Sequence, residues 1–587
     1  MPRVAVFSKV LVANRGEIAV RVFRTLRELG IGTVAVYSEA DRGSVHAGAA
    51  DEAYLLGPGP PAESYLSQER LLEVAKRAGA EGVHPGYGFL AENASFARAC
   101  EEAGLVWIGP PPEAIELMGS KTAARERMQA AGVPIVPGTT DPITSADEVG
   151  RIGDEIGWPV AIKAAAGGGG KGLKVVANAG EAERAFESAR REGKAYFSDP
   201  TVYVERYIED PRHVEVQVLA DAHGNVVHLG ERDCTIQRRH QKLVEETPSP
   251  AVDATLRGRI GRIAIDAARA VGYRSASTIE GLLDRDGNYY FLEMNTRIQV
   301  EHTVTELCYG VDLVREQILV AAGEPLSFGQ AELVGTGHAI ECRINAEDAI
   351  AGFLPSPAVI TRYREPAGPG VRVDSGVVEG SEVVGLYDPM IAKLVVWDRT
   401  REEARRRMLR ALEEYVIEGP TTLLSFYRVL LSHPCFIEGE TCHGLVESDA
   451  LAAAAAELDG RPVSGPVTGR MRERVATVEL DGKRFDVKVL ASEPPYAELA
   501  RKRRERSRGG GAHGVARDAV VTPMQGTVLA VSVTEGEKIE AGQVICVVEA
   551  MKMENEITAH RGGTVTELSV VPGQSVQNGQ VVCIVTG

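Results

Sequence analysis

Lys552 lies between Met551 and Met553 in the stretch EAMKMEN, in the last part of a chain of 587 residues. Strand-like patterns flank this stretch, so we expect the lysine on an exposed turn of a rigid scaffold, a position that suits a residue presented to another molecule. A solvated surface lysine is the plainer interpretation, because the chain contains 65 lysine and arginine residues and most lysines are exposed.

Two carboxylates and an amide form a second candidate site. Glu293 and Asn295 alternate in EMNTRIQVEH and therefore share one face of a strand, and Glu280 lies in the preceding strand-like STIEGLL. Hard oxygen ligands of this kind suit Mg²⁺ bridging the phosphates of a nucleotide. A strand with a charged, solvent-facing side is the alternative.

A glycine-rich run, GGGGKG at 167–172, is a third candidate. Without Cβ atoms, its backbone N–H groups can approach an anion such as a phosphate closely. The run does not match the phosphate-binding loop that ends in Lys-Ser or Lys-Thr before a helix. A glycine-rich hairpin without a ligand remains possible on this motif alone.

The apolar patterns around these residues predict several α/β units. KVLVAN, a helix from Glu17 and TVAVYS read as strand, helix and strand, which favours a parallel sheet. Residues 120–205 read as a smaller α/β unit, in which VAIKA and GLKVV are two strands joined by the glycine run. Residues 208–445 are rich in strand patterns with helices between them, which predicts α+β structure.

The last segment contains a repeat. Residues 526–548 align without gaps on residues 563–585 and match Gly526 with Gly563 and Cys546 with Cys583. Each half alternates apolar and polar residues between turn glycines, so we expect two similar β-units packed with approximate two-fold symmetry. Lys552 falls in the connection between the halves. Before this segment, RVATVELDGKRFDVKVL predicts a short hairpin within a linker.

Composition excludes some classes of function. The formal net charge of −17 argues against a general affinity for nucleic acid or anionic lipid. The basic stretch RKRRERSR at 501–508 flanks GGGAHG and is best interpreted as a solvated linker. The eight cysteines contain no C-x-x-C pair, so we expect reduced, buried thiols in a cytoplasmic protein. Neither an export signal nor a run of about 18 apolar residues is evident.

Together, MGSK, AIKAAAGGGGKG, VERYI, PRHVEVQV, RDCTIQRRHQK, LEMNTRIQVEH, HAIECRINAED and YDPMIAKL resemble the biotin carboxylase subfamily of ATP-grasp enzymes, over residues 3–445. EAMKMEN within a duplicated β domain resembles the biotin-attachment motif of biotin carboxyl carrier domains; lipoyl domains share that architecture but usually lack Met-Lys-Met. The whole chain is similar to the α subunit of a bacterial acyl-CoA carboxylase of the acetyl-/propionyl-CoA type.

The resemblance implies a multidomain α/β and α+β protein that ends in an all-β biotinyl domain, a flattened barrel or sandwich. The implied domains are an N-terminal α/β domain (1–118), an ATP-grasp region (119–319) with a mobile lid (about 135–205), a biotin carboxylase C-terminal domain (320–445), a linker with a small ordered element (446–515) and the biotinyl carrier domain (516–587).

The implied reaction uses ATP and bicarbonate to form carboxyphosphate, whose CO₂ is captured by biotin held covalently on Lys552. Glu301 matches the family's general base, and Arg297 and Lys242 match cations that hold the carboxylate of bicarbonate. Arg343 matches the arginine that stabilises the biotin enolate, a role that suits a permanently charged guanidinium.

Further residues are implied around the nucleotide and its metal. Those matched to ATP binding are Lys121, Lys163, Gly167, Gly168, Gly169, Gly170, Glu205, Ile208, His213, Gln237 and His240. Those matched to Mg²⁺ or Mn²⁺ are Glu280, Glu293 and Asn295. A lid that closes over ATP is expected because water would hydrolyse carboxyphosphate.

Three positions depart from the family pattern. Gly281 replaces a bulky residue beside Glu280, Thr303 replaces the proline of EHPVTE, and Leu354 occupies a position that is often arginine. None removes a catalytic group, so we expect effects on packing or rate. Gly281 is the most consequential of the three, because a glycine in a strand gives up side-chain packing.

The resemblance also implies partners: a separate carboxyltransferase (β) subunit, a biotin protein ligase, and a homodimer or higher complex, without nucleic acid or membrane. Three alternatives stay open. The chain is the α subunit of a 3-methylcrotonyl-CoA or pyruvate carboxylase; or it is a biotin carrier with an inactive carboxylase part; or it is an ATP-grasp ligase joining a carboxylate to an amine, with a lipoyl domain.

Overall fold

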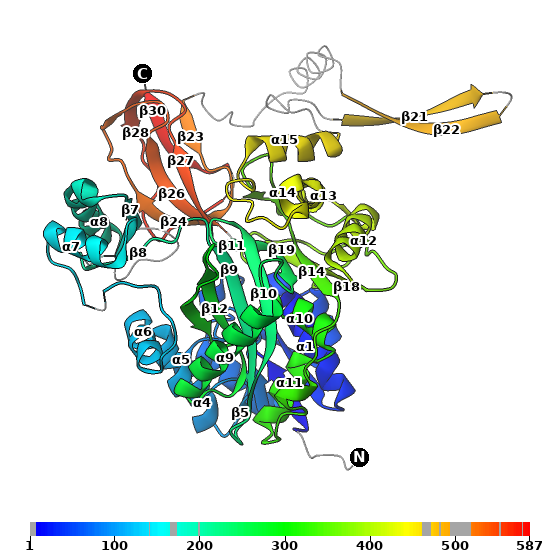
Figure 1. Ribbon diagram of the computed structural model, residues 1–587. Helices are drawn as coiled ribbons and strands as arrows, with labels where there is room; N and C mark the ends of the chain where they lie inside the picture. The colour runs from blue at the N-terminus through cyan, green and yellow to red at the C-terminus, as the bar shows by residue number, and fades with distance from the viewer. Residues whose placement is uncertain are drawn as a thin grey trace. The chain divides into compact units, whose positions relative to one another are not determined.

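The computed structural model describes residues 7–139, 141–164, 173–197, 200–460, 471–480, 483–492, 518–550, 553–577 and 579–586 (Figure 1). The chain divides into two compact units, Met1–Ala455 and Ala456–Gly587. Each unit is described by itself below.

The first unit begins with a parallel sheet in the order β3-β2-β1-β4-β5. Its strands are β1 (Lys9–Val12), β2 (Gly32–Ser38), β3 (Glu52–Gly57), β4 (Gly82–His84) and β5 (Val106–Trp107). The connecting helices are α1 (Gly16–Glu28), α2 (Val45–Ala49), α3 (Gln68–Ala78), α4 (Ala94–Glu102) and α5 (Pro112–Gly119). The predicted strand, helix and strand at the start of the chain are confirmed, and Ile18, Val22 and Leu26 of α1 are buried as their spacing required.

A small three-stranded sheet follows, in the order β7-β6-β8. Its strands are β6 (Val160–Ala164), β7 (Leu173–Val176) and β8 (Val202–Arg206), and its helices are α7 (Ala146–Ile156) and α8 (Ala182–Phe197). The two strands predicted on either side of the glycine run are present and antiparallel; Gly167, Gly168, Gly169 and Gly170 lie outside the described residues. This small sheet has an apolar core of its own, built around Val160, Ile162 and Phe186. Helix α6 (Lys121–Ala130) precedes it.

An eight-stranded antiparallel sheet forms the centre of the first unit, in the order β13-β12-β9-β10-β11-β14-β19-β18. Its strands are β9 (Arg212–Ala220), β10 (Val226–Arg238), β11 (Gln241–Thr247), β12 (Ser275–Leu283), β13 (Tyr289–Asn295), β14 (His338–Asn345), β18 (Val371–Ser375) and β19 (Met390–Asp398). One continuous sheet therefore includes strands from both sides of residue 320.

Helices cover this sheet (Figure 1). They are α9 (Ala254–Ala270), α10 (His302–Tyr309), α11 (Leu313–Ala321), α12 (Arg401–Glu414), α13 (Leu424–Ser432) and α14 (Pro434–Ile437). Two short ladders complete the unit: β15 (Glu347–Asp348) with β16 (Leu354–Pro355), and β17 (Arg362–Arg364) with β20 (Val416–Glu418).

The expectation of reduced thiols is wrong for one pair of cysteines. Cys435 of α14 and Cys442 of the following loop form a disulfide, with their Cα atoms 5.7 Å apart. The turn that brings them together has no C-x-x-C signature, so spacing alone did not reveal the pair. Elsewhere in the described chain the prediction is confirmed, because Cys100, Cys234, Cys308, Cys342, Cys546 and Cys583 are free and buried.

In the segment between residues 446 and 515, the structure describes helix α15 (Asp449–Leu458) and a hairpin of β21 (Met471–Leu480) and β22 (Lys483–Ser492). The strands pair from Met471 opposite Ser492 to Leu480 opposite Lys483. The predicted hairpin is therefore present.

The last segment is a sandwich of two four-stranded sheets, β27-β26-β24-β29 and β23-β30-β28-β25. Its strands are β23 (Ala519–Val521), β24 (Gly526–Val531), β25 (Lys538–Ile539), β26 (Val544–Ala550), β27 (Met553–Thr558), β28 (Gly563–Thr566), β29 (Ser575–Val576) and β30 (Val581–Thr586). The sequence repeat makes β24 equivalent to β28, β25 to β29 and β26 to β30. The short strand β25 of the first half lies in the sheet of the second half, and its equivalent β29 lies in the sheet of the first half. The predicted all-β fold with two-fold symmetry is confirmed.

In the part of the chain that the structure describes, no helix is both long and apolar enough to cross a membrane.

Candidate active site

A row of charged side chains crosses the eight-stranded sheet from β10 to β13. The register places Arg232 opposite Glu215, Glu215 opposite Glu280, and Glu280 opposite Glu293. The other face of the same strands is apolar, since Val214, Val216 and Ile279 belong to a buried core with α9. The alternation of strand residues thus separates one apolar face from one charged face.

Two irregularities in the ladders place key residues on the charged face. In β11 the register shifts between Ile236 opposite Val244 and Gln237 opposite Lys242. In a regular strand Lys242 would share a face with Val244, which lies in an apolar core; the extra residue, Leu243, turns Lys242 to the other face. An equivalent shift in β13 leaves Leu292 unpaired beside Glu293. Such bulges re-aim side chains next to functional sites.

Lys242 is the centre of the charged cluster. Its Nζ donates to three carboxylates, Glu215 Oε2 at 2.5 Å, Glu301 Oε1 at 2.7 Å and Glu280 Oε1 at 2.9 Å. Burial disfavours the ammonium, but the three carboxylates raise the pKa of Lys242 well above its usual range. One lysine therefore compensates much of the negative charge that this face buries.

Glu301 is shared between two cations. It lies at the start of α10, 2% exposed, and its Oε2 accepts from Arg343 Nη2 at 2.9 Å. Burial alone would raise the pKa of Glu301, but Lys242 and Arg343 hold it far below its usual range. The carboxylate is therefore ionised, and its proton affinity is low while both cations hold it.

Arg343 on β14 is oriented by a second carboxylate. Its Nε donates to Glu245 Oε1 at 2.6 Å, and Glu245 is completely buried. Burial raises the pKa of Glu245 to about 7, despite the neighbouring arginine. The guanidinium is thus gripped on two sides, which fixes the direction of its remaining donors.

Glu280 and Glu293 are the best candidates for a metal ion. They face each other directly across β12 and β13. Although Glu293 is exposed, partial desolvation of its carboxyl group and the neighbouring Glu280 charge raise its pKa, so a divalent cation between the carboxylates would relieve a repulsion present in the protein alone. The residues therefore fit a magnesium ion.

His213 lies beside the same carboxylates. Its Nε2 is 2.7 Å from Glu280 Oε2. Although burial opposes it, the Glu280 charge raises the pKa of His213. Among the described residues, His213, Glu215 and Glu280 also bring ligand atoms within 4.8 Å of one another.

Asn295 and Arg297 are linked to this group. Asn295 Nδ2 donates to Glu280 Oε1 at 2.7 Å, and its Oδ1 accepts from Arg297 Nη2 at 3.0 Å. The amide oxygen of Asn295, which was predicted as a metal ligand, thus accepts a hydrogen bond from the Arg297 guanidinium in this structure. Arg297 Nε also donates to Glu92 Oε2 at 2.9 Å, which ties the cluster to the N-terminal part of the unit.

The other predicted nucleotide residues are distributed around the cluster. Lys163 and Glu205, on adjacent strands of the small sheet, form an ion pair, and Ile208 follows β8. Gln237 lies on β10 opposite Lys242.

Two predicted nucleotide residues are exposed. His240 lies at the tip of the β10–β11 hairpin with a φ of 65°, apart from the buried charges. Lys121 is exposed at the start of α6. Its positive charge partly offsets the desolvation and the Glu280 charge that raise the pKa of Glu293.

Several residues of the cluster had no predicted role, although some lie within the quoted motifs. Glu215, Arg232, Glu245, Gln299 and Glu92 all contact predicted site residues. A signal existed for Glu215, which alternates with His213 in PRHVEVQV. Arg232 begins the motif RDCTIQRRHQK, but that motif does not predict its surroundings: it is completely buried and donates to Glu215, Gln217 and Gln299.

The three departures from the family pattern have different surroundings. Gly281 is not an empty position: a Cβ there would lie 2.3 Å from the ring of Tyr289, whose hydroxyl donates to Ile279 O at 3.1 Å. The tyrosine fills the space that a larger residue at 281 would need. Thr303 donates its hydroxyl to the buried Glu341. Leu354 is half-buried on β16, opposite Asp348.

Lys552 and Met551 lie outside the described residues. The strands on either side pair up to Ala550 opposite Met553. Glycines at equivalent places of the repeat share their environment, since a Cβ on Gly526 would meet Glu549 O at 2.3 Å and one on Gly563 would meet Thr586 O at 2.5 Å.

The chain matches four family models in consecutive order. They are the biotin carboxylase N-terminal domain (residues 6–115), the carbamoyl-phosphate synthase L chain ATP-binding domain (120–328), the biotin carboxylase C-terminal domain (341–448) and the biotin-requiring enzyme domain (518–585).

Relatives match either nearly the whole chain or its carboxylase part. The biotin-dependent acyl-coenzyme A carboxylase alpha3 subunit of Mycobacterium leprae is 46% identical over 568 residues, 94% of each chain. The biotin carboxylase of Halalkalibacterium halodurans is 53% identical over 440 residues, 75% of this chain and 97% of that one. A pyruvate carboxylase subunit of Methanothermobacter thermautotrophicus is 54% identical over 434 residues, 74% of this chain and 88% of that one.

A solved structure has the fold of the first unit. The biotin carboxylase domain dimer of Hydrogenobacter thermophilus 2-oxoglutarate carboxylase, in complex with MgADP, ADP and bicarbonate, superposes with a TM-score of 0.70 at 48% identity. It covers 76% of this chain and 99% of its own. With the charged cluster described above, these matches show that the chain belongs to the biotin carboxylases, the biotin-dependent ligases of the ATP-grasp fold, and also carries a biotin-requiring domain.

Proposed function

We propose that the chain is the α subunit of a biotin-dependent acyl-CoA carboxylase of the acetyl-/propionyl-CoA type. The observation that carries this proposal is the similarity to the Mycobacterium leprae alpha3 subunit, which extends over 94% of both chains and includes the biotin-requiring domain. The propionyl-CoA carboxylase alpha chain of Ruegeria pomeroyi, 41% identical over 94% of this chain, supports the same class.

Bicarbonate binds at Lys242 and Arg297 in this proposal, and Glu301 removes its proton. In the protein alone, Lys242 and Arg343 keep Glu301 ionised. When Lys242 turns to bicarbonate, Glu301 loses one of its two cations and its proton affinity rises at the moment it acts as base. The deprotonated oxygen attacks the γ-phosphorus of ATP, releasing ADP and forming carboxyphosphate.

Arg343 acts on the carboxyl acceptor. When bound at Lys552, biotin would supply the ureido nitrogen that accepts the carboxyl group, and phosphate would leave from carboxyphosphate. Glu245 and Glu301 hold the guanidinium of Arg343 from two sides, so it offers its charge in a fixed direction to an oxyanion.

The nucleotide is held from two directions. Glu280 and Glu293, with Asn295 close by, would hold Mg²⁺, whose charge would neutralise that of the phosphates. Lys121 and Lys163 bind the phosphates, together with the backbone of Gly167, Gly168, Gly169 and Gly170. Glu205 and Ile208 meet the adenine, with His213, Gln237 and His240 near the nucleotide. Residues of about 135–205 close over ATP as a lid, which their separate apolar core supports.

We propose the domain boundaries expected from the sequence, 1–118, 119–319, 320–445, 446–515 and 516–587, with the central sheet shared by the second and third domains. The carboxyl group passes to a separate carboxyltransferase subunit, which binds the acyl-CoA, and a biotin protein ligase modifies Lys552. Homodimerisation through the carboxylase part is supported by the dimer of the Hydrogenobacter thermophilus domain.

The acceptor is tested on the native complex. The chain would be isolated from its source cells through its biotin group, and ATP-dependent incorporation of labelled bicarbonate measured with acetyl-CoA, propionyl-CoA, 3-methylcrotonyl-CoA and pyruvate. Labelled malonyl-CoA or methylmalonyl-CoA supports the proposal. Label that enters only 3-methylcrotonyl-CoA or pyruvate would assign the chain to one of those carboxylases instead.

A further inference from the structure

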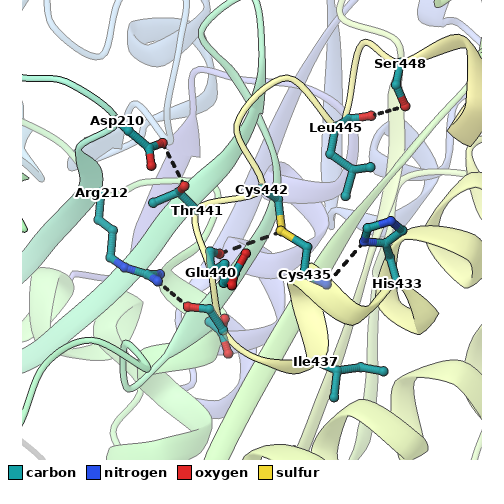
Figure 2. The surroundings of a disulfide bond; sticks show 12 residues. Asp210, Arg212, His433, Cys435, Ile437, Glu440, Thr441, Cys442, Leu445 and Ser448 are labelled. Atoms are coloured by element: carbon teal, nitrogen blue, oxygen red, sulfur yellow. Dashed lines mark hydrogen bonds between the residues drawn. A yellow bond between two sulfur atoms is a disulfide. The ribbon is translucent and has the colours of Figure 1, made fainter.

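The disulfide of Cys435 and Cys442 closes a short loop at the end of α14 (Figure 2). Cys435 is half-buried and Cys442 is 6% exposed. The loop between them carries Gly439, Glu440 and Thr441. No step of the proposed reaction uses this cysteine pair.

The closed loop holds the segment that joins the small sheet to the active site. Thr441 Oγ1 donates to Asp210 Oδ1 at 2.7 Å, and the carbonyl of Gly439 accepts from Arg212 Nη2 (Figure 2). Asp210 and Arg212 lie between Arg206, the last residue of β8, and His213, which faces Glu280. Arg212, which the loop contacts, is therefore the immediate chain neighbour of His213, a side chain of the charged cluster.

One residue on each side of this contact has a left-handed backbone conformation, which surrounding contacts must stabilise. Asp210 has a φ of 44° and Cys442 a φ of 54°. Side-chain-bearing residues rarely adopt this left-handed region without surrounding contacts. The disulfide holds Cys442 directly. Asp210 is held by the Thr441 hydrogen bond on one carboxylate oxygen and by Arg285, whose Nη2 donates to the other oxygen at 3.0 Å.

We propose that Cys435 and Cys442 form a thiol–disulfide modification site whose oxidised form clamps residues 210–212, the hinge of the ATP lid, and thereby positions His213 beside the nucleotide site. This inference rests on the proposed ATP-binding role of the small sheet. The reductant is a dithiol, either a small molecule or a protein. Opening the disulfide releases Gly439 and Thr441 from the hinge and weakens ATP binding.

The exchange is chemically balanced. A thiolate of the dithiol attacks the Sγ of Cys435, the more exposed of the two residues; the S–S bond breaks, and Cys442 leaves as a thiolate that takes up a proton. The second thiol of the reductant resolves the mixed disulfide and releases Cys435 as a thiol, so the reductant becomes a disulfide and the protein gains two electrons and two protons. The Glu440 carbonyl, 3.7 Å from Cys442 Sγ, is a ready acceptor for the new thiol.

The test measures the KM for ATP in bicarbonate-dependent ATP cleavage by the full chain, before and after treatment with dithiothreitol. Alkylation and intact mass verify the state of the two cysteines. Reduction is expected to raise the KM about three- to ten-fold, the range of one lost hydrogen bond, with kcat changed less. Cys435→Ser with Cys442→Ser should reproduce the rise and abolish the response to dithiothreitol.

Two single variants separate the clamp from a general loss of stability. Thr441→Val keeps the disulfide but removes the bond to Asp210, and should raise the KM for ATP like reduction. Glu440→Ala changes an exposed side chain of the same loop and should leave the KM unchanged. Equal KM values in the oxidised, reduced and Thr441→Val proteins would overturn the inference, as would free thiols at both positions after exposure to air.

A failure of the proposed function gives a different result. If the chain shows no bicarbonate-dependent ATP cleavage in either redox state, the proposed function is contradicted. The clamp is then tested by calorimetry, which measures the Kd of a non-hydrolysable ATP analogue in the oxidised and the reduced protein. A Kd that rises on reduction supports the clamp, and a Kd that stays constant contradicts it.

Discussion

The charged cluster of the carboxylase part and the sandwich of the biotinyl domain solve opposite problems. The cluster buries Arg232, Lys242 and several carboxylates on one face of a sheet, whereas the sandwich buries an apolar core of valines, isoleucines and cysteines. Catalysis on charged substrates requires preorganised charges away from water. A carrier needs only a stable scaffold that presents one side chain.

Both regions contain register shifts, but the shifts serve different ends. Those at Leu243 and Leu292 place charged side chains on the face of the cluster. The sandwich has shifts of its own, between Val528 and Ala530 and between Val544 and Cys546, within a repeated apolar unit. Its turn glycines have matching conformations, with φ of 86° and 85° at Gly536 and Gly573. Interdependent charges should therefore respond to mutation far more strongly than repeated apolar positions.

The largest effect is expected for Glu301→Gln, which removes the proposed base while keeping its shape. The rate of bicarbonate-dependent ATP cleavage should fall about 10²–10⁴-fold, the usual contribution of a general base. Steady-state ADP release measures this, with Glu457→Gln, an exposed glutamate of α15, as the matched control. Activity within a few-fold of the unmodified protein would rule Glu301 out as the base.

Lys242→Met should both inactivate and destabilise the protein. It leaves Glu215, Glu280 and Glu301 without their shared cation, and breaking a buried ion pair from one side costs about 3–5 kcal/mol. Urea unfolding, followed for the carboxylase part, measures the loss, and Lys76→Met on the exposed face of α3 is the control. A loss below about 1 kcal/mol would mean that the carboxylates become protonated at little cost.

Glu246 gives a pH-dependent test on the same sheet. Although burial opposes it, hydrogen bonds from His338 and Arg401 lower the pKa of Glu246 to about 2. Its contribution to stability, about 3 kcal/mol from this shift, is complete above the unfolded pKa of 4.5 and is lost as the pH falls from there toward 2.

Glu246→Gln should therefore lower the free energy of unfolding at pH 7, and the difference from the unmodified protein should shrink by about 1 kcal/mol at pH 4. Urea titrations at the two pH values measure it. A difference that is the same at both would show that the carboxylate charge is not the stabilising feature.

The smallest effects are expected in the sandwich. Gly526→Ala and Gly563→Ala each push a methyl group against a carbonyl oxygen at equivalent places of the repeat. Each should destabilise the biotinyl domain by about 1–3 kcal/mol, the usual cost of overpacking, and the two costs should be similar. Calorimetry of the full chain measures both. A large inequality would show that the symmetry of the backbone does not extend to energetics.

The sequence predicted the regular parts of the molecule well. The alternation of Glu293 with Asn295 and the repeat of residues 526–548 on 563–585 led directly to the strands observed. Motif resemblance identified Glu301, Lys242 and Arg343, which the structure brings into direct contact.

What the sequence did not reveal depends on contacts between distant segments. Arg232 and Glu245 are ordinary strand residues until β9, β11 and β14 pair beside them. Tyr289 compensates for Gly281 only because a hairpin places them in contact. The disulfide needs a turn between Cys435 and Cys442 that no spacing rule describes. Tertiary pairing supplies information that local pattern does not contain.

The central claim is that the carboxylase part uses ATP and bicarbonate to carboxylate biotin on Lys552. The most direct measurement is ADP release by the purified, biotinylated chain with and without bicarbonate, together with transfer of labelled bicarbonate to the chain and to its Lys552→Ala variant. We predict ADP release that depends on bicarbonate, and label on the unmodified chain but not on the variant. ATP cleavage at the same rate with and without bicarbonate, or equal label on the Lys552→Ala variant and the unmodified chain, would contradict this claim.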